Sequence, residues 1–178
     1  LGSVWYDEKI NVGNGFAASF TFHFSNGQFN NYEPTGIALV LHNEEEAVQN
    51  GAVMGYDGYP NVAIEIDPLM NIQEPSENHV AVHTLGPNEP NTFQTHATVA
   101  VESIPIDLKD RKTHQARIYY QNNKLLVFMD TFPEPLLEVD INIADSLNSS
   151  DAWIGIVGNT TFIWAHHDIL CWEVQSGQ

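Results

Sequence analysis

The stretch Phe16–Phe24, which reads FAASFTFHF, decides the fold class of this chain. Aromatic or small apolar residues occupy every second position, and Ala, Ser, Thr and His fill the positions between them. This period of two places the aromatic rings on one face of a β-strand, because successive side chains of a strand point to opposite sides. No long segment of the sequence keeps the period that is typical of an apolar helix face. We therefore predict an all-β domain.

The rest of the chain contains short segments of the same kind, separated by turn residues. Gly36–His42 is a nearly continuous apolar run, which is typical of a central strand. Arg117–Tyr120 and Lys124–Met129 flank the polar residues 121–123 and predict a hairpin with an Asn-Asn turn. Further strands are expected at Val62–Asp67, His79–Thr84, Ala97–Val101, Trp153–Val157 and Ile169–Val174, and one helical turn at Ile143–Leu147. Consecutive strands with spaced turns indicate a sandwich or a barrel.

Composition and charge limit the possible partners. A chain of 178 residues with 43% hydrophobic residues is long enough for one domain with a full core. Only 6 Lys and Arg residues oppose 23 Asp and Glu residues, which gives a net charge of -17. Such a surface repels phosphate backbones and anionic lipids, so we exclude nucleic acid and membrane surfaces as partners. The sequence also lacks the apolar run of about 18 residues that insertion into a membrane requires.

The segment Asn61–His79 carries the candidate chemistry. On the predicted strand Val62–Asp67, Glu65 and Asp67 share one face, where adjacent carboxylates repel each other unless a cation lies between them. The residues that follow offer further ligands: Asn71, Glu74, His79 and the main-chain carbonyl of Leu69. Carboxylates, an amide and a carbonyl suit Ca²⁺, whereas an imidazole suits Mn²⁺ or another transition ion. The alternative interpretation is a solvated acidic strand face.

The spacing Glu-x-Asp-x-φ-x-Asn, followed by acidic-Pro-Ser-x-x-His, resembles the metal loop of the legume-type (L-type) lectins. The segments Gly2–Tyr6, Gly36–Asn43 and His167–Trp172 resemble strands of that family, so the resemblance covers nearly the whole chain. It implies a single L-type lectin-like domain over residues 1–178, with a two-sheet antiparallel jelly-roll sandwich of the concanavalin A-like kind. We expect this domain either to lack its first strand or to belong to a longer protein. The resemblance also implies secretion or a cell-surface location.

The resemblance assigns a role to each residue of the metal loop. It implies that Glu65 and His79 hold the transition ion, such as Mn²⁺. Asp67 and Glu74 would bridge this ion and Ca²⁺, and the family usually has Asp at the position of Glu74. The remaining calcium ligands would be the carbonyl of Leu69 and the side chain of Asn71.

A glycan site beside the calcium is also implied by the resemblance, at Thr35, Gly55, Leu69, Asn71 and Phe162. Asn71 matches the family, but Thr35 stands where the family has Asp, and Leu69 stands where it often has an aromatic ring. These two changes remove a charge-assisted hydrogen bond and a stacking surface. Phe162 either supplies stacking from a neighbouring loop or is buried at the end of the sandwich.

The expected function is that of a calcium-dependent carbohydrate-binding domain for glycans or glycoproteins, with a structural two-metal site and a role in adhesion. The alternative is a metal-stabilised adhesion or protein-interaction module that has lost sugar binding. A third interpretation is a glycoside hydrolase of the same fold, because some of these enzymes use Glu-x-Asp-x-x-Glu on one strand. Their mechanism needs two carboxylic acids, and the second would fall on Met70. We therefore do not expect an enzyme.

Overall fold

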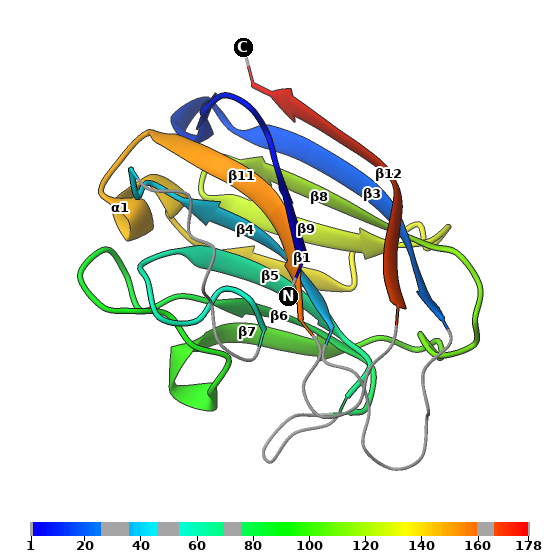
Figure 1. Cartoon of the computed structure of the whole chain (residues 1–178). Helices are drawn as coiled ribbons and strands as arrows, with labels where there is room; N and C mark the ends of the chain where they lie inside the picture. The colour runs from blue at the N-terminus through cyan, green and yellow to red at the C-terminus, as the bar shows by residue number, and fades with distance from the viewer. Residues whose placement is uncertain (1, 26–35, 46–53, 70–75, 160–165, 178) are drawn as a thin grey trace.

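The computed structural model describes residues 2–25, 36–45, 54–69, 76–159 and 166–177. They form two antiparallel sheets (Figure 1), one in the order β1-β11-β4-β5-β6-β7 with β2 beside β11, the other in the order β10-β9-β8-β3-β12. The elements are β1 Gly2–Trp5, β2 Ile10–Asn11, η1 Val12–Asn14, β3 Phe16–Ser25, β4 Ile37–His42, β5 Val62–Asp67, β6 His79–His83, η2 Thr95–Ala97, β7 Thr98–Ser103, β8 His114–Gln121, β9 Lys124–Met129, β10 Leu137–Asp140, α1 Ile143–Leu147, β11 Asp151–Gly158 and β12 His166–Ser176. This architecture confirms the predicted all-β, two-sheet antiparallel sandwich.

Most strands lie where the sequence pattern predicts them. The hairpin between β8 and β9 pairs Gln121 with Lys124, and its two-residue turn places Asn122 and Asn123 at φ values of 53° and 61°. Asn tolerates this left-handed backbone better than most residues, which explains why the Asn pair forms the turn. The sequence pattern missed β1, β2 and β10, which contain four, two and four residues and are too short to show a period. Only the family resemblance indicated a strand at β1.

The main core lies between the two sheets. Every second residue of β3 from Phe16 to Phe24 is buried there, as the alternation predicts. The opposing sheet contributes Ile64 and Ile66 from β5 and Val80 and Val82 from β6, all of which are fully buried. Burial of apolar surface at native packing density is the main source of stability in such a core.

A second apolar cluster covers the other face of the larger sheet. Every residue of β4, β5 and β6 is buried, so these strands are covered on both faces. Within the described ranges, segment 54–59 covers this face, and its Met54, Tyr56 and Tyr59 pack with Ala38, Ala63 and other residues of the strands. Polar side chains on this outer face of β5 and β6 are therefore buried rather than solvated.

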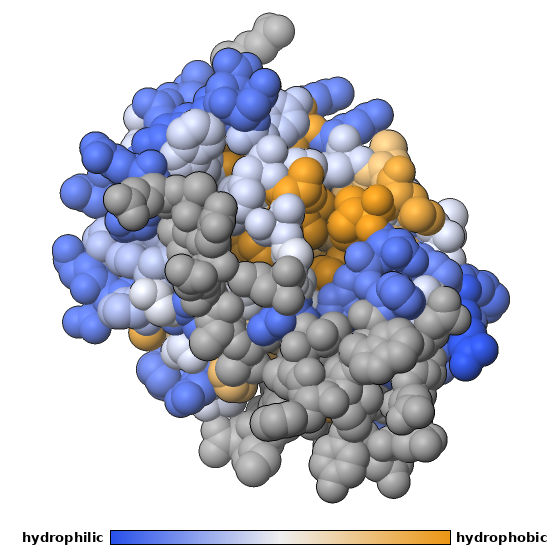
Figure 2. Space-filling view, in the orientation of Figure 1, coloured by the Kyte–Doolittle hydropathy of each residue, from blue (hydrophilic) through white to orange (hydrophobic). Residues whose placement is uncertain are grey.

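A groove separates the edge strands β1 and β12. It has a volume of about 630 Å³ and is lined by residues of β1, β11 and β12. Figure 2 shows apolar side chains gathered on this part of the surface, where Val4 and Leu170 are 43% and 59% exposed. Among the described residues, no helix has the length and apolar character needed to cross a bilayer.

Candidate metal centre

The strand register brings three of the expected metal ligands together. Glu65 and Asp67 are two residues apart on β5 and share its outer face, and Asp67 pairs with His79 on β6. One ligand atom from each of the three side chains lies within 4.8 Å of the other two. All three residues are buried, with exposed fractions of 1%, 0% and 1%. The solvated acidic face, which was the alternative, is therefore wrong for this strand.

This cluster fits a cation in both space and chemistry. The residues paired with Glu65 on the neighbouring strands are Ala38 on β4 and Ala81 on β6, and both have only a methyl side chain. Burying two carboxylates beside each other is costly unless positive charge or hydrogen-bond donors compensate for the lost water. Two carboxylates and an imidazole form a donor set typical of a transition ion.

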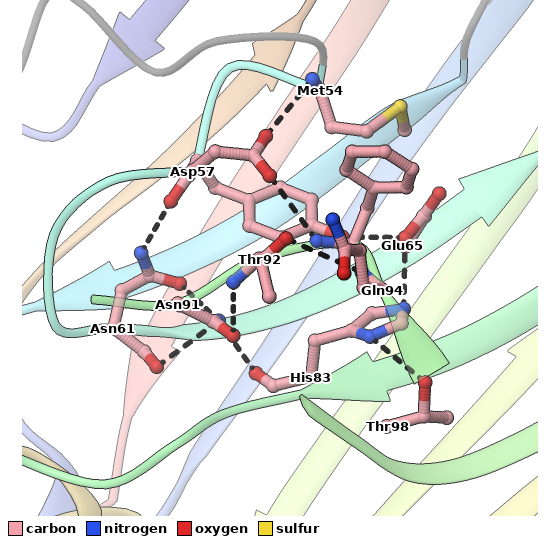
Figure 3. A network of polar contacts seen from close by, with 11 residues as sticks. Met54, Asp57, Asn61, Glu65, His83, Asn91, Thr92, Gln94 and Thr98 are labelled. Atoms are coloured by element: carbon pink, nitrogen blue, oxygen red, sulfur yellow. Dashed lines mark hydrogen bonds and ion pairs between the residues drawn. The ribbon is translucent and has the colours of Figure 1, made fainter. Parts of the chain in front are cut away.

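Glu65 has two further partners, Tyr56 and His83, that the sequence did not reveal. The Tyr56 hydroxyl donates to Oε2 of Glu65 at 2.6 Å, and Nε2 of His83 lies 2.9 Å from the same oxygen. Figure 3 shows His83 between Glu65 and Thr98, with Nδ1 of His83 3.2 Å from the Thr98 hydroxyl oxygen. The spacing of His79 and His83, four residues apart on one strand, was the available signal, because it places both rings on the same face.

These contacts set the charge of the buried carboxyl group. Burial raises the pKa of Glu65, but His83 and then Tyr56 lower it, and the net direction is below the usual value. The pKa of Tyr56 is raised well above its usual value by burial and by the negative charge of Glu65. Glu65 is therefore an ionised acceptor at neutral pH, and Tyr56 is a neutral donor.

A polar network around Asn61 and Asn91 joins segment 54–61 to β6 (Figure 3). The Asn61 side-chain amide donates to the carbonyls of Tyr56 and Tyr59 at 2.7 and 2.9 Å. The Asn91 amide donates to the side-chain oxygen of Asn61 at 2.7 Å and to the carbonyl of His83 at 2.9 Å. These bonds connect segment 54–61 to residue 91 and to β6, so the backbone of Tyr56 is held in place.

A second anchor joins the same two loops at Asp57. Its carboxylate accepts from the backbone N–H groups of Met54 at 3.1 Å and Phe93 at 3.2 Å. Gly55, which was expected to contact sugar, lies inside this anchored turn at a φ of 89° and is buried. That positive φ favours glycine over residues with a Cβ atom.

The chain turns directly after β5. Oδ1 of Asp67 accepts from the backbone N–H of Leu69 at 2.7 Å, so this carboxylate also shapes the start of the loop that follows β5. The Leu69 side chain is half-buried. Nζ of Lys109 donates to the carbonyl of Pro68 at 3.4 Å and lies 3.2 Å from Glu77, which places a positive charge beside this loop.

The remaining site predictions fall outside the residues that the structure describes. They are Asn71 and Glu74 of the metal loop, Thr35 and Phe162 of the expected glycan site, and Met70, which stands where a hydrolase would carry its second acid. The structure therefore brings Glu65, Asp67 and His79 together. Their roles as metal ligands, the predicted calcium ligands and all of the glycan contacts stay predictions.

Two packed antiparallel sheets, with a buried acid and histidine cluster on the outer face of the larger sheet, define a lectin-type sandwich. The sequence matches the family described as "Legume lectin domain" over residues 1–178, and the chain belongs to this family. Membership confirms the resemblance seen in the sequence and the concanavalin A-like jelly roll. It also places the chain among carbohydrate-binding proteins that are not enzymes, which makes the hydrolase interpretation wrong.

Solved structures of lectins share this fold. The VIP36 exoplasmic/lumenal domain bound to Ca²⁺ and Man3GlcNAc superposes with a TM-score of 0.78 and 16% identity, over 99% of this chain and 73% of that chain. The winged bean acidic lectin in complex with methyl-α-D-galactose superposes with a TM-score of 0.76 and 14% identity, over 97% of this chain and 78% of that chain. Lectin I-B4 from Griffonia simplicifolia, in a metal-free form, superposes with a TM-score of 0.71 and 21% identity, over 98% of this chain and 79% of that chain. No curated protein matches the chain.

Proposed function

We propose that this domain binds glycans or glycoproteins in a manner that depends on Ca²⁺ and a transition ion. The observation that carries the proposal is the buried cluster of Glu65, Asp67 and His79, whose ligand atoms lie within 4.8 Å of one another. The cluster occupies the part of the sequence that resembles the family's metal loop. The family itself supports carbohydrate as the ligand.

In this proposal the ions act structurally. Glu65 and His79 hold the transition ion, such as Mn²⁺, and Asp67 with Glu74 bridges it to Ca²⁺. The Leu69 carbonyl and Asn71 complete the calcium site. The positive charges offset the cost of burying the acidic groups, and they fix the loop that carries Asn71.

The glycan site is proposed beside the calcium, at Thr35, Gly55, Leu69, Asn71 and Phe162. Because Thr35 and Leu69 supply no charge and no aromatic ring, we expect weak affinity at a single site and adhesion through several copies. The solved relatives are described with mannose-containing and galactose ligands, so a screen needs both classes. The lumenal VIP36 domain supports a secretory-pathway, extracellular or cell-surface location.

The test is a glycan array probed with the domain in Ca²⁺ and Mn²⁺, repeated after chelation. We expect binding to mannose-type or galactose-type glycans that disappears in chelator and in the variant Asp67→Asn. The matched control is Asp140→Asn, because Asp140 is an exposed acid on β10 that pairs with Lys124 far from the cluster in sequence. Glycan binding that survives chelation would overturn the proposal.

A second candidate function is a metal-stabilised protein-interaction or adhesion module without sugar binding. The observation that favours it is the aliphatic, half-buried side chain of Leu69 at a position where the family often has an aromatic ring. A domain whose melting temperature depends on ions, but which binds no glycan on the array, would support this second function.

A further inference from the structure

The Glu65 carboxylate is held by two side chains that the metal loop does not contain. Tyr56 donates to Oε2 of Glu65 at 2.6 Å, and Nε2 of His83 lies 2.9 Å from that oxygen. Among the described residues, the group of close ligand atoms comprises Glu65, Asp67 and His79 and does not include His83. Both contacts share Oε2, so neither of these two side chains engages the other oxygen, Oε1.

The orientation of the His83 ring is fixed from several directions. Nε2 of His83 lies 2.9 Å from the Glu65 carboxylate, and Nδ1 lies 3.2 Å from the Thr98 hydroxyl oxygen, so each ring nitrogen faces a polar group. The backbone carbonyl of His83 accepts from Asn91 at 2.9 Å. With 3% of its surface exposed, His83 is shielded from bulk solvent.

Tyr56 is held as firmly as His83. Its ring is fully buried and stacks on the His83 ring, with centroids 5.9 Å apart and planes 28° apart. Its backbone carbonyl accepts from Asn61 at 2.7 Å, and Asn61 is in turn bonded to Asn91. The phenol and the imidazole therefore form one packed unit around Oε2 of Glu65.

We propose that Tyr56 and His83 are positioning residues, which hold Glu65 as a single-oxygen ligand and so make this end of the site selective for a transition ion. Because Oε2 of Glu65 already faces the Tyr56 hydroxyl and Nε2 of His83, an ion binds more favourably through Oε1 alone than through both oxygens. Ca²⁺ often takes a carboxylate through both oxygens, whereas one carboxylate oxygen beside the imidazole of His79 suits Mn²⁺. This inference rests on the ion site of the proposed function, but it does not require that the domain binds sugar.

The test is a titration of the folded domain with Mn²⁺, followed by electron paramagnetic resonance of the free ion. Tyr56→Phe removes only the hydroxyl, and we expect Mn²⁺ affinity to fall about 10-fold or more, as for other groups that orient a metal ligand. The variant His83→Leu should lose at least as much Mn²⁺ affinity. His83→Gln keeps an N–H donor and should recover part of the affinity, which a purely space-filling role would not predict.

The matched control is His42→Leu, because His42 is also a buried histidine and lies on β4 of the same sheet. Its ring packs against Trp5 and Tyr59 rather than against the ion cluster. We expect His42→Leu to change thermal stability and leave Mn²⁺ affinity within about twofold of wild type, in line with the usual independence of separate sites.

Three results would overturn the inference: no Mn²⁺ binding by the wild type, unchanged affinity in Tyr56→Phe, or an equal loss in His42→Leu. If His83→Leu fails to fold, Tyr56→Phe and His83→Gln still decide the question. The expected pattern of Mn²⁺ affinities without any glycan binding would leave this inference standing and overturn only the proposed sugar function.

Discussion

The two faces of β5 and β6 differ sharply although alternate residues of the same strands form them. The inner face, toward the second sheet, carries Ile64, Ile66, Val80 and Val82. The outer face carries Glu65, Asp67, His79 and His83. Both faces are buried to the same degree, so burial alone does not separate them.

The difference lies in what covers each face. A complete sheet covers the inner face, where apolar contact alone stabilises the packing. Loops cover the outer face. Each buried charge there needs a specific polar group to compensate for the lost water, as the Tyr56 hydroxyl does for Glu65. The inner face therefore determines the fold, and the outer face forms the site. Substitutions on the inner face should lower stability, whereas substitutions on the outer face should alter ion binding.

The largest effect is expected on the inner face. Ile64→Ala leaves a cavity between the sheets, and we expect the free energy of unfolding to fall by about 2–5 kcal/mol in urea denaturation. Val99→Ala, at a β7 residue that is 43% exposed, is the control and should stay within about 0.5 kcal/mol of wild type. Similar losses in the two variants would contradict the assigned core.

Removal of the Asp67 charge, which we propose bridges the two ions, should act through the ions. At an ion concentration about 100 times the dissociation constant, binding stabilises the native state by about 2.7 kcal/mol. We expect chelator to lower the melting temperature of the wild type markedly. Asp67→Asn should melt at a temperature that no longer depends on Ca²⁺ or Mn²⁺, as followed by differential scanning fluorimetry. An ion-dependent melt in this variant would argue against Asp67 as a ligand.

Loss of the Tyr56 hydroxyl should have a somewhat smaller effect, and it should appear even without ions. Tyr56→Phe leaves an ionised, buried Glu65 with one donor fewer, and a hydrogen bond to a charged group contributes about 1.5–3 kcal/mol. Urea denaturation in chelator measures this loss. Tyr119→Phe alters a tyrosine that is 44% exposed and should be close to neutral. Equal stability of the two variants would show that the Tyr56 contact contributes little.

The smallest effect concerns His42, which has no carboxylate partner within the part of the chain that the structure describes. Burial, and then the charge of Lys9, lowers the pKa of His42 from 6.5 to about 4. Between these values the unfolded chain binds more protons than the native protein, so stability falls as the pH drops from about 6.5 to about 4. We expect His42→Leu to show a shallower decline in urea denaturation at pH 7, 6 and 5. A decline of unchanged slope would mean that other groups cause it.

The sequence predicted most strands and only part of the site, for physical reasons that differ. Alternation revealed β3 because one of its faces is less buried, and turn residues delimited β5, which is buried on both faces. The motif predicted that Glu65, Asp67 and His79 lie together, and they do because the pairing of β5 with β6 sets Asp67 opposite His79. Tyr56 could not be found in this way, since its contact with Glu65 arises where segment 54–59 folds back over the sheet. Thr35, Asn71, Glu74 and Phe162 stay predictions.

Metal analysis of the domain tests the central claim most directly. Wild type and Asp67→Asn are dialysed against buffer containing Ca²⁺ and Mn²⁺, then freed of unbound ions, and both metals are quantified by mass spectrometry. The account predicts that the wild type retains Ca²⁺ and Mn²⁺ and that the variant loses them. A wild type without bound metal, or a variant that retains as much, would contradict it.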